Sequence, residues 1–287
     1  IDSAPWLNTS ASIEVQVVPQ PLRASIAGGG ARSIGSSEGL VLDASASFDP
    51  DVSPTDRSGD DLTFTWSCNE RQLNASTNAS SPSCVDAAGG IVQLPAARRV
   101  EFPAGTFAPL QAAVRVFKLT VGVGGALTWR NSTAEVSVTV VEGESVRVEL
   151  EPLAALRSSA SERLVLRGAV AASTAAVSSV ADAGADDLVY RWRVASPVSA
   201  LTLTQAERAT PEDSDVLVLR PNVLEPGTSY TVELSVADRV YRGRSGGFAS
   251  LNVYTAELPR GGRYLVNPQE GIALQTPFTL SMQEWQG

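Results

Sequence analysis

The chain has 287 residues, of which 43% are hydrophobic and 18% charged, so it contains enough apolar material for ordinary globular cores. Its net charge is −9, and such an acidic surface repels phosphate backbones, which argues against nucleic acid as a partner. It has no histidine and only two cysteines, which excludes Ser-His and Cys-His catalysis, histidine metal sites and four-cysteine zinc sites.

The sequence shows neither a signal-peptide pattern nor a candidate membrane span. It begins with Ile1, and no signal-peptide pattern follows. No apolar run approaches the roughly 20 residues that a transmembrane helix needs. We therefore expect a soluble segment without a membrane span, taken from inside a larger protein.

Short stretches of alternating hydrophobicity predict strands from the first residues onward. Apolar residues alternate with polar ones over 12–18, and Pro19 and Pro21 end this strand. The Gly-rich segment 27–35 is expected to be a loop or a weak edge segment. Residues 40–43 form a short apolar strand that breaks into a turn-forming cluster at 43–51.

The clearest strand is 62–68, in which Leu62, Phe64, Trp66 and Cys68 lie on one face and three hydroxyl residues on the other. The polar stretch 69–84 is expected to be a loop, and 91–94 a short strand. Alternation returns over 114–123 and over 136–140.

The second half of the chain repeats this order. DLVYRWRV at 187–194 matches DLTFTWSC at 61–68 position for position, with Trp192 in place of Trp66. ERLVLRG at 162–168 matches EGLVLDA at 38–44, and 230–236 matches 117–123. These matches indicate an internal repeat of about 120 residues. Each copy carries one tryptophan on the apolar face of a strand, where a core position is expected.

These patterns predict an all-β chain of tandem immunoglobulin-like, antiparallel β-sandwiches. We expect residues 1–20 to hold the last strand of a preceding module, 21–143 the first sandwich, 144–258 the second, and 259–287 the start of a third module. The charged junction 141–152 alternates like a strand, which favours a stiff connection between the sandwiches.

The first unit resembles the REJ (receptor for egg jelly) region of polycystin-1-like proteins, which is related to the PKD immunoglobulin-like fold. The residues that carry the resemblance are Leu40, Leu42, Asp43, Ser45, Ser47, Asp49, Pro50, Asp51, Leu62, Phe64, Trp66 and Cys68, with Cys84 as partner. The tail resembles the same family through Gly261, Gly262, Pro268, Gly271, Ala273, Leu274, Thr276 and Phe278. The family usually has cysteines flanking this tail motif, whereas here those places fall near Tyr264 and Met282, so a disulfide is missing there.

The resemblance implies an extracellular part of a large membrane protein at the plasma or ciliary membrane. In that context Cys68 and Cys84 are expected to form a disulfide, the alternative being two reduced, buried thiols. Four sequons, at Asn8, Asn74, Asn78 and Asn131, lie in segments that we interpret as loops or termini, where a glycan can be solvated.

Asp43, Asp49 and Asp51 offer carboxylate oxygens within nine positions and are the only candidates for a metal, as a Ca²⁺ site. The favoured interpretation is an Asx turn that ends a strand, because the EF-hand pattern is absent. We therefore expect neither a metal nor another cofactor.

No residue set indicates a reaction. A carboxylate-based glycosidase needs two facing carboxylates in a cleft, whereas the acidic residues here cluster in turns. Taken together with this, the resemblance implies a non-catalytic scaffold or adhesion segment of a polycystin-1-like surface glycoprotein, associated with a polycystin-2-like cation channel subunit or a ciliary surface filament protein. The alternative is the ectodomain of a gamete or glycan recognition receptor.

Overall fold

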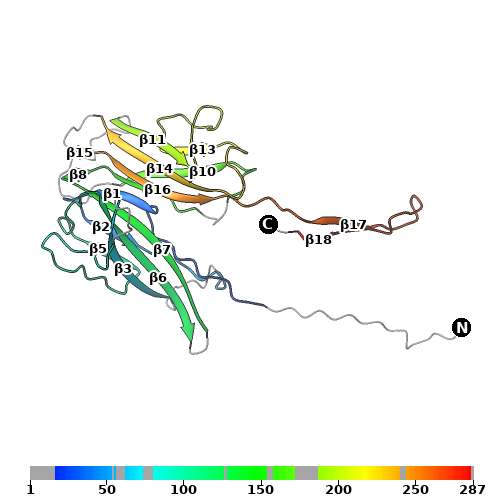
Figure 1. Cartoon of the computed structure of the whole chain (residues 1–287), viewed down its shortest axis with the longest axis horizontal. Helices are drawn as coiled ribbons and strands as arrows, with labels where there is room; N and C mark the ends of the chain where they lie inside the picture. The colour runs from blue at the N-terminus through cyan, green and yellow to red at the C-terminus, as the bar shows by residue number, and fades with distance from the viewer. Residues whose placement is uncertain are drawn as a thin grey trace.

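The computed structural model describes residues 17–53, 55, 62–73, 80–125, 128–153, 158–171, 187–239 and 244–285. Every regular element in these ranges is a β-strand, and the strands form two sandwiches and a separate hairpin (Figure 1). The predicted all-β chain of tandem immunoglobulin-like sandwiches is confirmed.

The first sandwich packs two antiparallel sheets around one core. The smaller sheet pairs β2 (Leu40–Asp43) with β5 (Arg99–Phe102). The larger consists of β7 (Thr128–Val141), β6 (Ala113–Gly125), β3 (Thr63–Gln72) and β4 (Ser80–Ser81). Along β3 the odd residues 63–67 are exposed, whereas Phe64, Trp66 and Cys68 are buried, because successive side chains of a strand point to opposite faces. The indole of Trp66 donates a 2.9 Å hydrogen bond to the carbonyl oxygen of Ala97.

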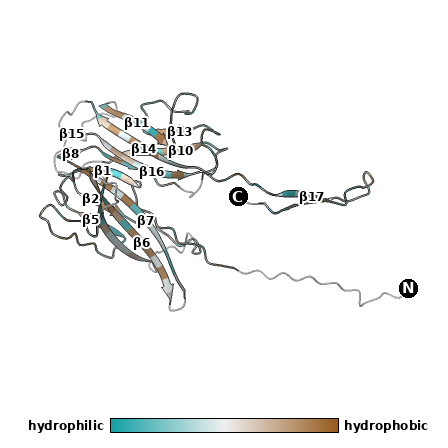
Figure 2. Ribbon diagram, in the orientation of Figure 1, coloured by the Kyte–Doolittle hydropathy of each residue, from teal (hydrophilic) through white to brown (hydrophobic). Residues whose placement is uncertain are grey.

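The second sandwich repeats this arrangement. Its smaller sheet has the order β13 (Val216–Leu219), β10 (Leu164–Ala171), β9 (Arg147–Leu150), and its larger sheet has the order β12 (Ala200–Leu201), β11 (Leu188–Ala195), β14 (Ser229–Asp238), β16 (Gly247–Tyr254). The indole of Trp192 donates to the carbonyl oxygen of Ser214 at 2.7 Å, as Trp66 does to Ala97. Figure 2 shows hydrophobic and hydrophilic residues alternating along β6 and β14, the matching central strands. The two cores draw their buried residues from 22–140 and from 146–253.

One strand joins the two sandwiches. β1 (Ala31–Gly35) runs parallel to β7 through five residue pairs and antiparallel to β16 through two. The larger sheets are thereby continuous, with nine strands in the order β12-β11-β14-β16-β1-β7-β6-β3-β4. In Figure 1, β1 lies between β16 and β7. The expectation of a loop or weak edge segment over 27–35 is therefore wrong for 31–35, where pairing on both sides overrides the weak local strand preference.

Two further local expectations are also wrong. Residues 69–72 are not a loop, because β3 continues opposite β6 as far as the pair Gln72–Ala113. Residues 91–94 are not a strand, since Ile91 makes only an isolated bridge to Val85. The junction is partly stranded, as predicted: β8 (Glu144–Ser145) runs parallel to β15 (Arg244–Ser245), and β9 pairs with β10.

The ends of the chain lie outside both cores. Residues 17–20 have no regular structure, and the rest of the expected first strand lies outside the described residues. At the other end, β17 (Arg263–Asn267) and β18 (Thr279–Gln283) form a hairpin that projects from the second sandwich (Figure 1).

Candidate functional site

The two cysteines are joined in a disulfide at the edge of the first core. Cys68 lies in β3 and Cys84 follows β4, both are buried, and their Cα atoms are 5.4 Å apart. The bridge ties β3 at Cys68 to the residue that ends the 69–84 segment. Asn74 and Asn78 fall within this segment, but they lie outside the described residues.

A buried arginine that the sequence did not single out supports the same region. Arg115 of β6 is 1% exposed and forms a 3.4 Å ion pair with Glu70 of β3. It also donates to the carbonyl oxygen of Ala108 at 2.8 Å and lies over the ring of Phe107. Burial is the largest influence on Arg115 and lowers its pKa, although the charge of Glu70 acts in the opposite direction. An isolated arginine in an alternating strand carries no sequence signal for such a role.

Asn131 is exposed, but it lies in β7 opposite Gly122 of β6 and not in a loop. The expectation of a loop there is wrong because the β6–β7 hairpin extends to its last pair, Gly125–Thr128. An exposed side chain on a strand still leaves room for a glycan. Asn8 lies outside the described residues.

The three aspartates of the calcium hypothesis are divided between two arginines. Asp49 and Asp51 both pair with Arg130 of β7, the Asp51 contact being 2.8 Å. These contacts raise the pKa of Arg130, mainly through the hydrogen bond to Asp49. Asp49 also caps its own turn, since its side chain accepts a hydrogen bond from the backbone N–H of Asp51. The carboxylate of Asp51 accepts one from the backbone N–H of Gln20, which is distant in the sequence.

Asp43 is held separately from that pair. It accepts a 2.8 Å hydrogen bond from the N–H of Ser45 and lies 3.7 Å from Arg99. Burial alone would raise the pKa of Asp43, but the hydrogen bonds from Ser45 and the charge of Arg99 outweigh it and lower that pKa. In the part of the chain that the structure describes, no three acidic or cysteine residues form a group able to hold a metal ion.

The junction between the sandwiches is built around buried polar side chains. Arg32 of β1 donates to the carbonyl oxygens of Ala27 at 2.9 Å and Val41 at 2.7 Å. Burial, together with the nearby charge of Arg147, lowers the pKa of Arg32 to about 10, and Glu149 opposes this shift. At the other end of β1, the carboxylate of Glu38 accepts from the N–H of Gly35 at 3.0 Å and from the hydroxyl of Ser145 at 3.3 Å.

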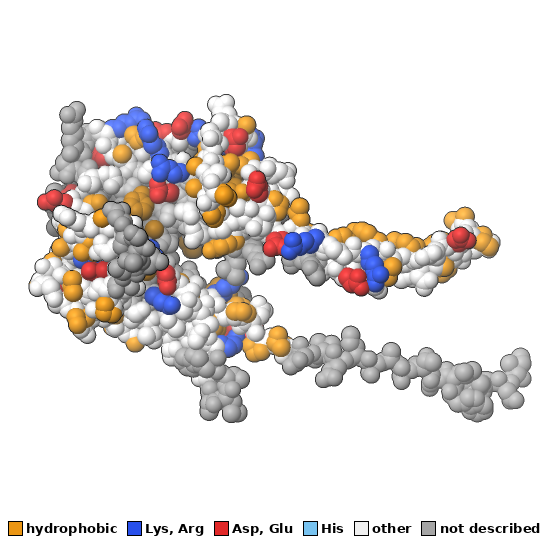
Figure 3. Space-filling view, in the orientation of Figure 1, with side chains coloured by type: hydrophobic (Ala, Val, Ile, Leu, Met, Phe, Trp, Pro, Cys, Tyr) orange, Lys and Arg blue, Asp and Glu red, His pale blue; other side chains and the backbone are white. Residues whose placement is uncertain are grey.

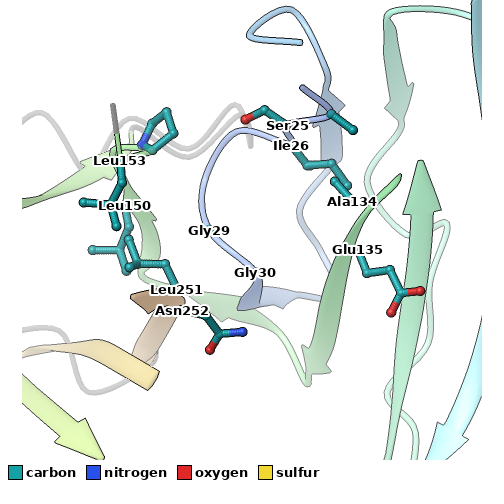
Figure 4. A pocket seen from close by; sticks show the side chains of 12 residues that line it. Ser25, Ile26, Gly29, Gly30, Ala134, Glu135, Leu150, Leu153, Leu251 and Asn252 are labelled. Atoms are coloured by element: carbon teal, nitrogen blue, oxygen red, sulfur yellow. The ribbon is translucent and has the colours of Figure 1, made fainter. Parts of the chain in front are cut away.

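A crevice of about 210 Å³ opens beside this junction (Figure 4). One wall comes from the second sandwich, with Leu150, Leu153 and Leu251, and the other from the first, with Ile26 and Ala134. In Figure 4 the Gly29–Gly30 turn passes between these walls. Among the described residues that line the crevice, Glu135 is the only ionisable one, and it pairs with Lys118 at 3.7 Å. Apolar walls with one carboxylate suit the seating of a partner side chain and offer no acid–base pair.

The projecting hairpin has one apolar face. The cross-strand pairs Tyr264–Met282 and Val266–Leu280 lie on one side, and the ring of Trp285 packs against Tyr264. All of these side chains are at least 40% exposed. Figure 3 shows hydrophobic side chains gathered along the hairpin. An exposed apolar surface of this kind is suited to contact with another surface.

Comparison with solved structures gives matches at low similarity, among them chains with several immunoglobulin domains. Immunoglobulin domains 1–4 of Sidekick-1 align with 12% identity over 83% of this chain and 48% of theirs, with a TM-score of 0.24. A structure that addresses Dscam isoform specificity aligns with 13% identity over 93% of this chain and 60% of the other, with a TM-score of 0.26. Murine CEACAM1b aligns with 10% identity over 82% of this chain and 100% of its own, with a TM-score of 0.22. The chain thus spans about half of the Sidekick-1 chain that it matches.

The comparison with protein families covers the whole chain. A family model described as the REJ domain matches residues 1–287, which include both sandwiches and the hairpin. Within the described ranges, the structure has no helix that is both long and apolar enough to cross a bilayer. Because the match extends over all 287 residues, the chain belongs to the REJ domain family, an extracellular type of region in polycystin-1-like proteins.

Proposed function

We propose that this segment is a non-catalytic scaffold and adhesion part of a polycystin-1-like surface glycoprotein of the plasma or ciliary membrane. Residues 21–143 and 144–258 are its two sandwich modules. Residues 1–20 belong to a preceding module and 259–287 begin a following one. The glycans are carried at Asn8, Asn74, Asn78 and Asn131.

The observation that carries this proposal is the continuity of the nine-stranded sheet across β1. Two sandwiches joined only by a flexible linker would reorient freely, whereas a shared ladder of backbone hydrogen bonds resists bending. A further bond across the junction runs from the N–H of Phe248 to the hydroxyl of Ser33 at 2.9 Å. Such a joint suits a spacer that transmits force or holds docking surfaces at a fixed angle.

The use of charged residues supports a non-catalytic role. Asp49, Asp51 and Glu70 are all engaged by arginines. Glycoside hydrolysis requires two carboxylates that face each other across a substrate. The junction crevice offers Glu135 alone among its described lining residues. This crevice and the apolar face of the hairpin are therefore surfaces suited to a partner.

We further propose that the parent protein associates with a polycystin-2-like channel subunit or a ciliary surface filament protein. The test is affinity purification of the native parent protein from detergent-solubilised membranes, with mass spectrometry of the co-purifying chains. A channel subunit or a ciliary filament protein in the eluate supports the proposal. Recovery of only gamete-surface or matrix glycoproteins would favour the alternative, a recognition receptor.

A matched pair of variants of the parent protein tells whether the hairpin contributes to that association. Tyr264→Ser combined with Leu280→Ser removes two exposed apolar side chains from the hairpin face. The control is Val198→Ser, because Val198 is 93% exposed on the second sandwich and lies outside the hairpin. Loss of the partner with the double variant only would assign docking to the hairpin, and equal recovery would assign it elsewhere.

A further inference from the structure

A second groove, of about 380 Å³, lies at the edge of the larger sheet of the second sandwich. It is separate from the junction crevice, and the scaffold function proposed above does not depend on it. Its lining residues come from β11, β12, β14 and the segment that follows β12, and those that matter here are Arg191, Trp192, Arg193, Arg208, Glu212 and Glu233.

The groove lies where the pairing of β11 is incomplete. β12 pairs with β11 through only two residue pairs, Val194–Leu201 and Ala195–Ala200. The N–H of Tyr190 turns away from β14 and donates to the carboxylate of Asp213 at 2.6 Å. Because hydrogen-bonding direction alternates along a strand, the backbone N–H and C=O of Trp192 face the same outer edge. Within the described ranges no strand pairs with Trp192 on that side.

The charge of the groove is unusual for this chain. Three arginines and two glutamates line it, whereas the whole chain has a net charge of −9. Arg193 is exposed at the rim and its contact with Glu233 is 3.9 Å, a weak ion pair. The groove therefore favours an anionic ligand by charge complementarity.

Arg208 supplies a buried cation with unused donors. Its side chain is 10% exposed, and its guanidinium is paired only with Glu212, at 3.2 Å, among the described residues. Glu212 itself is 83% exposed, and the Nε of Arg208 is buried without a hydrogen-bond partner. A desolvated guanidinium with unused N–H groups is a costly arrangement that a second carboxylate would relieve, since arginine binds carboxylates through two parallel hydrogen bonds.

We propose that this groove binds an extended, acidic peptide segment of a partner protein. The peptide adds to the sheet edge through backbone hydrogen bonds to Trp192, and one of its carboxylates pairs with Arg208. Backbone pairing at Trp192 uses the outward-facing position of β11 that lies between the β12 pairs and the Asp213 contact, and the arginines explain the preference for an acidic sequence. The inference is independent of the scaffold function, so either can fail alone.

The test is fluorescence anisotropy with the whole chain and two labelled octapeptides, one alternating Val and Glu and the other Val and Gln. The Glu peptide is expected to bind at least about tenfold more tightly, and Arg208→Gln to weaken its binding by about tenfold, because a charge-assisted hydrogen bond is lost. Arg193→Gln is expected to weaken it about threefold. The control is Arg163→Gln, the same charge change at an exposed site outside the groove, which should leave binding within about twofold of the unchanged chain.

Several outcomes overturn the proposal. These are equal binding of the two peptides, no binding of either, or equal affinity of the Arg208→Gln and Arg163→Gln variants. A preference for a sialylated oligosaccharide over the Glu peptide would also overturn it and would assign the groove to acidic glycans. If circular dichroism shows that Arg208→Gln is unfolded, the affinities of Arg193→Gln and Arg163→Gln for the Glu peptide are compared instead. Equal affinities of these two variants would then overturn the proposal.

Discussion

The backbone N–H of Gly30 donates a 2.6 Å hydrogen bond to the carbonyl oxygen of Ser250, and Ala31 is paired with Ser250 in the sheet. The two residues belong to different sandwiches and lie far apart in the sequence. The junction therefore depends on the close approach of two backbones as well as on side-chain packing.

The neighbouring Gly29 gives the first prediction. Its φ is +100°, and a Cβ at this position would lie 2.6 Å from the carbonyl oxygen of Ser250. Gly29→Ala is therefore expected to lower the free energy of unfolding by about 2–3 kcal/mol, since strained backbone and steric overlap add. The control is Gly105→Ala, because Gly105 has a φ of +75° and open space around it, and it should cost only about 1 kcal/mol. Urea unfolding measures both, and equal costs would show that the contact with Ser250 is unimportant.

The disulfide gives the second prediction. Cys68 and Cys84 are separated by 16 positions, and closing a loop of this size stabilises a domain by about 3 kcal/mol. Replacing both cysteines by alanine should lower the unfolding free energy by about that amount. Urea unfolding of the variant and of the oxidised chain measures the difference. Mass spectrometry of the alkylated native protein provides the check, because two modified thiols would contradict the bridge.

The lowered pKa of Asp43 predicts that the stability of the fold decreases at acidic pH. Its pKa is lowered in the folded state, so the carboxylate contributes stability above the ordinary aspartate value of 3.8 and loses it as the pH falls through the lowered value. Asp43→Asn should reduce stability at neutral pH and flatten the decline of the melting temperature below about pH 4. Calorimetry from acidic to neutral pH measures this, and parallel curves for the two proteins would contradict the assignment.

The pairing of Asp49 and Asp51 with Arg130 predicts indifference to calcium. The guanidinium already occupies the position between the two carboxylates where a cation would bind. Millimolar calcium is therefore expected to leave the melting temperature unchanged. Arg130→Gln should lower the melting temperature without calcium, because two carboxylates lose their shared partner. A calcium-dependent rise in the unchanged chain would restore the calcium hypothesis for these residues.

The hairpin gives the fifth prediction. Tyr264 and Met282, near the places where the family usually has cysteines, are directly opposite each other in β17 and β18. Opposite side chains have Cβ atoms about 5 Å apart, so Tyr264→Cys and Met282→Cys together should form a disulfide on air oxidation. The control pairs Tyr264→Cys with Leu280→Cys, which are diagonal and should remain reduced. Counting free thiols distinguishes the two double variants, and equal oxidation of both would contradict the pairing register of β17 and β18.

The sequence alone determined the elements whose signal is local. Strict alternation over Leu62–Cys68 and Tyr230–Val236 identified strands of the larger sheets, because burial on one face of a strand requires a period of two. The repeat of the two tryptophan strands then showed that the same sandwich is built twice, and the family resemblance supplied the context for the disulfide. These features were readable because each depends on residues that are close in the sequence.

Only the tertiary structure decided how the sandwiches are joined and where polar groups meet. Ala31–Gly35 is a weak strand by its own preference, and it is stranded because β7 and β16 supply hydrogen bonds on both sides. Arg130 reaches Asp49 across 81 positions, and the open edge of β11 appears only because β12 stops after two residue pairs. Pairing between distant segments leaves no local pattern in the sequence, because its free energy depends on which backbones the fold brings together.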